Sequence, residues 1–365
     1  AIELLQESIE NAQKKDYLLS VAKTYHNLGY IYELKMDNEK ALEYYLKALQ
    51  LKRNFSDSSS VSSTLNNIGN IYANYEEYQK AEEYYRQSLA ISRYLKDSAD
   101  IALRYYNLAR NYRKMHKFEK SMEYFLASLE IYELLKKPGE ISKVYNALGN
   151  LYALWQKNEE AISHYEKAIK YLDENEDANT LARIYNNLAD MNDQTGNIKQ
   201  AEAYYKKSQE HFHKTKLFKE YITVNINYAM FLVKQKDYEK ARKLLAETIQ
   251  LAKEKDNMYL MANALISYSK LYHAKRQYRT ALNILNEAKK KAQQTNSFKL
   301  KQRIYLEYYK NFKKLRQYRN ALSYYERYQE MGDSVFTKET LKNIAELEKQ
   351  YQLKQKEKEI LLLSS

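Results

Sequence analysis

A forty-residue period of small residues runs along almost the whole chain. The first series places glycine, alanine or serine at the same position of each repeat: Gly29, Gly69, Ala109, Gly149, Ala189, Ala229 and Ser269. A second series lies 12 residues further on, at Ala41, Ala81, Ser121, Ala161, Ala201, Ala241, Ala281 and Ala321. Two independent series that share one period indicate a repeat protein, in which each unit packs mainly against its neighbours.

Large apolar residues accompany the small ones. Four residues after the second series lie Tyr45, Tyr85, Phe125, Tyr165, Tyr205, Leu245, Leu285 and Tyr325. Spacings of three and four residues place side chains on one face of a helix, so each repeat predicts two helices. In the first repeat, helix A covers about residues 21–34 and helix B runs from residue 39 past residue 51. Stacked hairpins would bury their apolar faces in one continuous all-α core.

Composition agrees with long helices and excludes several kinds of site. The 365 residues include one Pro and six Gly, where average usage would supply about 18 and 26, so strand hairpins and Gly-rich phosphate loops are not expected. The chain has no Cys, which excludes disulfides and thiolate metal sites. Its six His residues form no two-His zinc motif on one helix face. We therefore expect no enzymatic activity, no metal and no cofactor.

The repeat resembles the tetratricopeptide repeat signature. The residues that carry the resemblance in the first repeat are Leu28, Gly29, Tyr32, Ala41, Tyr45 and Ala48, and in the fourth Leu148, Gly149, Tyr152, Ala161, Tyr165 and Ala168. That family usually has 34 residues per repeat, so the six additional residues here, as at 57–61 and 136–140, are expected to extend helix B or its connection. The resemblance implies a right-handed α-α superhelix. It assigns 1–20 to the second helix of a truncated repeat, 21–331 to eight hairpins and 332–365 to a charged helical tail.

The long period is similar to that of kinesin light chains and of bacterial peptide-sensing regulators, which implies a non-enzymatic module that binds a peptide or protein segment. A charged helical tail after such repeats resembles the sensor region of bacterial membrane-anchored regulators, where a helix leads to a membrane span and a histidine kinase or helix-turn-helix output domain. This implies an extracytoplasmic sensory region, with a cytoplasmic location as the alternative. Membrane contact is expected only through segments outside this chain.

Asparagine recurs on the predicted face of helix A. The series is Asn27, Asn67, Asn107, Asn187 and Asn227, joined by Asn66, Asn70, Asn146, Asn150 and Asn186. Each Asn costs a helix roughly half a kcal/mol relative to Ala, which indicates a compensating role. Amides can hydrogen-bond the backbone of an extended peptide. The family resemblance implies this role for Asn67, Asn70, Asn107, Asn146, Asn150 and Asn187, and we predict it for Asn186 too. Alternatively, the amides bond neighbouring repeats and fix their stacking angle.

A basic and aromatic stretch joins this ladder in the third repeat. Tyr106, Arg110 and Arg113, followed by Lys114, could meet an acidic side chain or a C-terminal carboxylate. The plainer interpretation is a solvated basic face. The carboxylate clamp of chaperone-binding family members needs a Lys at a helix A position where this chain has His26, Asn66, Tyr106 or Asn146. Binding of a heat-shock-protein tail is therefore disfavoured.

Two further functions stay open from the sequence. Residues 337–363 alternate Lys and Glu, with apolar residues at heptad spacing, so the tail is either a single extended helix or half of a parallel coiled coil. Self-association as a homodimer through this tail and the basic segment 289–319 is the first alternative. That segment has eleven Lys or Arg residues and one acidic residue, Glu307. Nucleic-acid binding by the same segment is the weaker alternative and predicts a steep salt dependence.

Overall fold

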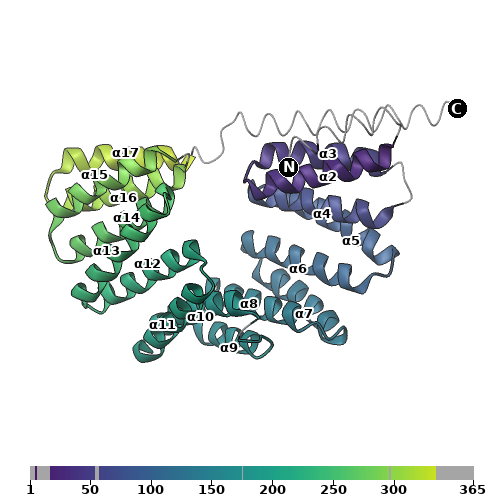
Figure 1. Cartoon of the computed structure of the whole chain (residues 1–365), viewed down its shortest axis with the longest axis horizontal. Helices are drawn as coiled ribbons and strands as arrows, with labels where there is room; N and C mark the ends of the chain where they lie inside the picture. Colours follow the sequence, from purple (N-terminus) through teal and green to yellow (C-terminus); the bar gives the residue numbers. More distant parts are fainter. Residues whose placement is uncertain (1–4, 6–16, 54–56, 175, 296, 334–365) are drawn as a thin grey trace. The chain divides into compact units, whose positions relative to one another are not determined.

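A computed structural model describes residue 5 and residues 17–53, 57–174, 176–295 and 297–333. This part of the chain folds into sixteen helices and contains no strand, so the expected all-α fold is confirmed (Figure 1). The predicted truncated repeat over 1–20 lies largely outside the described residues, and so does the predicted tail over 332–365.

The helices alternate between the two types that the sequence predicts. The A helices are α2 (Leu18–Leu34), α4 (Ser58–Asn74), α6 (Ser98–Lys114), α8 (Pro138–Leu154), α10 (Ala178–Gln194), α12 (Phe218–Lys234), α14 (Met258–Ala274) and α16 (Phe298–Lys314). The B helices are α3 (Asn38–Lys52), α5 (Tyr78–Tyr94), α7 (Phe118–Leu134), α9 (Asn158–Ile169), α11 (Ile198–Lys214), α13 (Tyr238–Glu254), α15 (Tyr278–Gln293) and α17 (Tyr318–Asp333). Each of these helices begins twenty residues after the one before it, so every repeat consists of two halves of equal length.

The additional residues of the long period lie at the start of helix A. The Asp57 side chain accepts a 3.0 Å hydrogen bond from the backbone N–H of Ser60 and so caps α4. Pro138 begins α8, where a missing N–H costs nothing. Residues 58–61 and 138–140 are therefore the first turns of A helices. The expectation that they extend helix B or its connection is wrong for these residues, whereas residues 57, 136 and 137 lie in the connection before helix A.

The geometry of the helix ends explains how the chain forms its many turns with so few glycines. The residue after the C-cap has a left-handed backbone at regular intervals, and in most turns it is not glycine, as at Met36 (φ 60°) and Lys216 (φ 55°). In the first hairpin the N–H of Met36 donates to the carbonyl of Glu33 at 2.9 Å, and that of Asp37 to the carbonyl of Tyr32 at 3.0 Å. These two bonds form a Schellman motif. They offset a backbone cost of about 1 kcal/mol that a non-glycine residue carries there.

The chain divides into two compact units, each with its own core. The described helices of the first unit are α2–α8 and those of the second are α9–α17. In the first unit the core includes Tyr45, Tyr85 and Phe125, which the repeat pattern predicts. In the second it includes Tyr205 and Leu285 of the same series. The boundary falls after Lys157, in the turn between the two helices of one repeat.

Close contact between helix A and helix B depends on the small residues, as predicted. A Cβ atom at Gly29 would lie 2.6 Å from Cδ1 of Tyr45, and one at Gly69 would lie 2.7 Å from Cε1 of Tyr85. Both rings are buried. Each aromatic residue of helix B therefore lies directly against the backbone of helix A, in space that a side chain at the glycine would fill.

Replacing Gly69 with alanine is expected to lower the free energy of unfolding by about 1–3 kcal/mol, because the Tyr85 ring must move out of a packed core. Chemical denaturation with urea measures this change. Gly139→Ala is the matched control, since a Cβ atom there meets no atom within 4 Å, and it should leave stability unchanged or slightly raised. Equal losses in the two variants would contradict the packing explanation.

Candidate functional site

The predicted amides occupy three positions of helix A. We call two of them the floor positions, because their side chains are buried or half-buried: Asn66, Asn67, Asn107, Asn146, Asn186, Asn187 and Asn227. The third position directly follows the small residue, and we call it the outer row. Its side chains are exposed or half-buried: Tyr30, Asn70, Arg110, Asn150, Asp190, Met230, Lys270 and Lys310. Three and four residues separate the outer row from the floor, so both lie on one side of the A helices.

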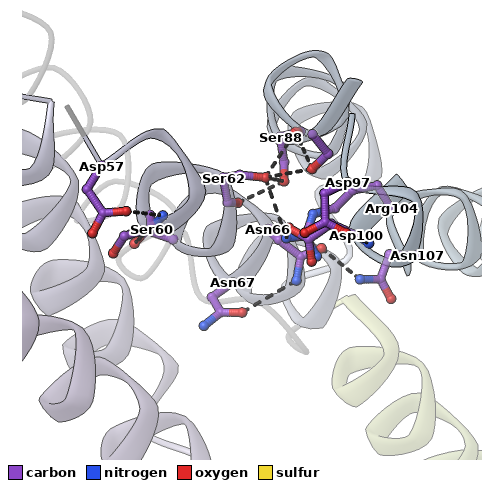
Figure 2. A network of polar contacts seen from close by, with 12 residues as sticks. Asp57, Ser60, Ser62, Asn66, Asn67, Ser88, Asp97, Asp100, Arg104 and Asn107 are labelled. Atoms are coloured by element: carbon purple, nitrogen blue, oxygen red, sulfur yellow. Dashed lines mark hydrogen bonds and ion pairs between the residues drawn. The ribbon is translucent and has the colours of Figure 1, made fainter. Parts of the chain in front are cut away.

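Some floor amides hydrogen-bond to each other across repeats. Asn107 on α6 donates through Nδ2 to Oδ1 of Asn66 on α4 at 2.7 Å (Figure 2). The equivalent bond in the second unit joins Asn227 on α12 to Asn186 on α10 at 3.1 Å. Asn107 is only 6% exposed. These bonds join neighbouring repeats, which is the stacking role that was the alternative to ligand binding. The predicted contact of Asn107 and Asn186 with a ligand stays a prediction.

The amides also hydrogen-bond to the core tyrosines. Asn67 donates to Oη of Tyr45 at 3.3 Å, and this hydroxyl donates to the Glu33 carboxylate at 2.7 Å. Burial raises the pKa of Glu33, and burial together with the nearby Glu33 charge raises that of Tyr45. Asn70 accepts a 2.8 Å hydrogen bond from Oη of Tyr85. The aromatic series and the amide ladder, which the sequence shows as separate patterns, are therefore directly connected.

The predicted basic stretch is assembled on α6. Tyr106 is half-buried with its ring edge against Phe125, at 5.6 Å between centroids. The Arg110 guanidinium lies 5.8 Å from the centre of the Tyr106 ring and is exposed. Arg113 is half-buried and Lys114 is exposed. Tyr106 and Arg110 thus form one patch beside the floor amides, as the sequence predicts.

The second unit contains a polar cavity at the equivalent positions. It has a volume of about 300 Å³ and lies among α10, α11 and α12. Asn186 and Asn187, both predicted as ligand contacts, line it together with Asp190 and Asp193. Partial desolvation by the surrounding cavity walls and the neighbouring charge of Asp193 raise the pKa of Asp190. Neither aspartate was predicted from the sequence, although the forty-residue period places Asp190 in the outer row with Asn70 and Asn150.

The predicted site residues belong to both units. Asn67, Asn70, Tyr106, Asn107, Arg110, Arg113, Asn146 and Asn150 belong to the first unit. Asn146 and Asn150 are half-buried on α8. Asn186 and Asn187 belong to the second unit. Each unit thus has its own set of candidate contacts.

Two features are absent from the described part of the chain. Within it, no group of three His, Asp or Glu side chains could hold a metal ion. None of its helices is both long and apolar enough to cross a bilayer.

Aromatic rings in the basic segment 289–319 differ in their exposure. Tyr308 is 2% exposed and stacks on Tyr324 at 4.4 Å between centroids, and Phe312 stacks on the same ring at 5.5 Å. Phe298 and Tyr318 are exposed. Single-stranded nucleic acids are bound by exposed rings between basic residues, so nucleic-acid binding by this segment stays a prediction.

Two family models match the repeats. A family model described as tetratricopeptide repeat matches residues 60–134, 140–212 and 220–294, and a second model of the same description matches residues 22–55. Together these matches cover more than half of the chain. A search of curated proteins finds no sequence match.

Solved structures share the solenoid fold. The apo form of the quorum sensor NprR from B. thuringiensis is 18% identical, with a TM-score of 0.65 over 90% of this chain and 95% of that one. The Rap conjugation gene regulator of plasmid pLS20, in complex with the Phr* peptide, is 16% identical, with a TM-score of 0.56 over 77% and 76%. A Rap protein complexed with competence and sporulation factor is 17% identical, with a TM-score of 0.52 over 95% and 100%.

Proposed function

Because the chain belongs to the tetratricopeptide repeat family, we propose that it is a non-enzymatic module that binds a peptide or protein segment along the outer row of its A helices. The observation that carries this proposal is the cavity in the second unit. There two predicted floor amides, Asn186 and Asn187, and one outer-row residue, Asp190, line the same open space. A peptide lying there would meet both donors and acceptors.

The outer row is better suited than the floor to contact a ligand. Floor residues such as Asn107 are already hydrogen-bonded inside the stack. Outer-row residues such as Arg110 and Asp190 are exposed. We therefore assign the floor amides chiefly to positioning of the repeats and the outer row chiefly to recognition. Extended peptides are commonly bound through their backbone, with side chains read in separate pockets.

The solved relatives support a peptide as ligand. One Rap structure contains the Phr* peptide and another contains competence and sporulation factor, and NprR is described as a quorum sensor. By analogy, we infer that this chain is the sensory region of a larger bacterial signalling protein, and that occupation of the outer row is the signal.

Selection of peptides on the full chain, followed by calorimetric titration, tests the proposal. A variant with Asn70, Arg110, Asn150 and Asp190 all changed to alanine is expected to bind the selected peptides at least 30-fold more weakly. Each lost hydrogen bond contributes about 0.5–1.5 kcal/mol, and bonds to the charged groups contribute more.

The matched control changes exposed residues of the B helices. Glu83, Glu123 and Lys243 are exposed on α5, α7 and α13, and their replacement by alanine should leave affinity unchanged. Thermal melts of both variants check that the fold is retained. A folded outer-row variant that binds as tightly as the control would refute the proposed binding surface.

A further inference from the structure

The cavity in the second unit has one unneutralised carboxylate. Lys234 lies 2.9 Å from Oδ1 of Asp193 and neutralises it. Asp190 is exposed and accepts a 3.2 Å hydrogen bond from Gln194, and no ion pair to it is found within the described residues. The cavity therefore keeps a net negative charge close to three asparagine amides.

The cavity walls also suit a cation. The rings of Tyr205 and Phe231 line it and lie 5.4 Å apart. Aromatic faces attract guanidinium and ammonium groups, most strongly where water is partly excluded. A volume of about 300 Å³ is at the lower end for ligand pockets and fits one long side chain. An arginine or lysine side chain, or a peptide amino terminus, would balance the charge of Asp190.

Opposite charge gathers on the A helices further along the same unit. Lys270 on α14 and Lys310 on α16 occupy the outer row, as Asp190 does on α10. Both approach the buried Glu307 carboxylate, Lys310 at 2.9 Å and Lys270 at 3.7 Å. Arg303 hydrogen-bonds Asn263 across the same two helices. Two lysines thus share one carboxylate, with Arg303 one helical turn away from Glu307 on α16, so this end of the row keeps a net positive charge and can accept a further anion.

The spacing between the two ends defines the ligand. Helix α12 packs on α14, and α14 packs on α16. Asn227 of α12 hydrogen-bonds Asn186 of α10, so these two helices are neighbours as well. Packed helices lie about 8–10 Å apart, so Asp190 on α10 lies roughly 16–20 Å from Lys270 on α14 and roughly 24–30 Å from Lys310 on α16. An extended peptide rises about 3.3 Å per residue. These distances correspond to about five to nine residues.

We propose that the second unit recognises a peptide of opposite charges, with a cationic group at Asp190 and a carboxylate about five to nine residues away at Lys270 and Lys310. This inference rests on the proposed function and adds the chemistry of the ligand. It differs from the sequence expectation, which placed charge recognition at the basic patch of the first unit and expected an acidic group alone.

Synthetic peptides of defined charge spacing test this inference on the full chain. The probes are acetylated and amidated peptides of Ala and Ser with one arginine and one aspartate separated by two, six or nine residues, in both chain directions. Separations of six or nine should bind at least tenfold more tightly than a separation of two. A second set, in which a free amino terminus replaces the arginine, distinguishes a terminal amine from a side chain.

Variants of Asp190 give the sharpest contrast. Asp190→Asn should weaken the best peptide about tenfold, and Asp190→Lys should restore affinity when the arginine of that peptide is exchanged for aspartate. Glu247→Gln, at an exposed residue of α13, is the control and should have no effect. Binding that ignores both peptide charge and Asp190→Asn would overturn this inference while leaving the proposed function intact. Failure to bind any peptide, including selected ones, would overturn both.

Discussion

Replacing Asp100 with asparagine is expected to lower the free energy of unfolding of the first unit by about 3 kcal/mol. The Arg104 side chain is 2% exposed, and its Nη2 lies 3.0 Å from Oδ2 of Asp100 (Figure 2). Removal of one partner from a buried pair leaves an uncompensated charge, which typically costs 3–5 kcal/mol. The lower end applies because the Asp100 side chain is 25% exposed and water reaches it. Urea denaturation followed by circular dichroism measures the loss.

The residues of other repeats at the Arg104 position suggest a control variant for this ion pair. At the register position of Arg104, other A helices have the buried apolar residues Val144, Ile184, Val224 and Ile304. Arg104→Val is therefore expected to be neutral or stabilising, as apolar replacement of buried ion pairs often is. In that background Asp100→Asn should cost less than about 0.5 kcal/mol, as a surface substitution does. Equal costs in both backgrounds would show that the ion pair is not the cause.

A second large effect is expected in the pH dependence of stability. Lys52 is 2% exposed, and its Nζ donates to Oγ1 of Thr64 at 2.9 Å. Burial lowers the pKa of Lys52 to about 8, although the charge of Asp57 raises it and that of Lys23 lowers it further. His26 contacts the same Thr64 hydroxyl at 3.1 Å. Burial and the Lys52 charge lower the pKa of His26 to about 4.

The sign of the effect follows from proton binding. The unfolded lysine has a pKa near 10.4, so between pH 8 and 10 the unfolded chain binds more protons than the folded one, and stability rises with pH. From pH 7 to 9.5 the gain from Lys52 should be about 2 kcal/mol, since one pKa unit corresponds to 1.36 kcal/mol.

Comparison with Lys52→Met isolates this contribution. Stability of both proteins is measured by urea denaturation at pH 7, 8, 9 and 9.5. Unfolded tyrosines, with a pKa near 10, begin to ionise at the upper end of this range, but their contribution is the same in both proteins and cancels in the comparison. At pH 7 the methionine variant should have a higher free energy of unfolding than the natural chain. This difference should become smaller as pH rises. Parallel pH profiles of the two proteins would contradict a buried, charged Lys52. A nuclear magnetic resonance titration should also show a higher pKa for His26 in the variant.

The period of forty was enough to predict the helix pairs, and the family match and the helix order confirm them. Residue spacing puts the small and the large residues on defined faces of each helix, but it does not determine which of them meet. The contact between the Tyr85 ring and the backbone at Gly69 of the same hairpin is seen only in the structure. Turn geometry was less accessible. Residues with a left-handed backbone, such as Met36 and Lys216, do not share one residue type, because backbone hydrogen bonds and not a glycine stabilise these turns.

The candidate site was only partly accessible to sequence reasoning. Floor and outer-row positions lie within one helical turn, so periodicity cannot separate an amide that bonds a neighbouring repeat, as Asn107 does, from one that bonds within its own repeat, as Asn70 does. Asp190 was not predicted because the prediction followed asparagine as a residue type and not the outer-row position. The buried Arg104 was not predicted because several other repeats have an apolar residue at its position.

Photo-crosslinking of a bound peptide tests most directly whether recognition takes place on the outer row. The photoreactive residue p-benzoylphenylalanine is placed at Arg110 or Asp190 in the outer row, or at Glu123 or Lys243 on exposed faces of B helices, and irradiated with a selected peptide. We expect crosslinked peptide from an outer-row position and none from the B helices. Crosslinking at Glu123 or Lys243, with none at Arg110 or Asp190, would contradict recognition by the A helices.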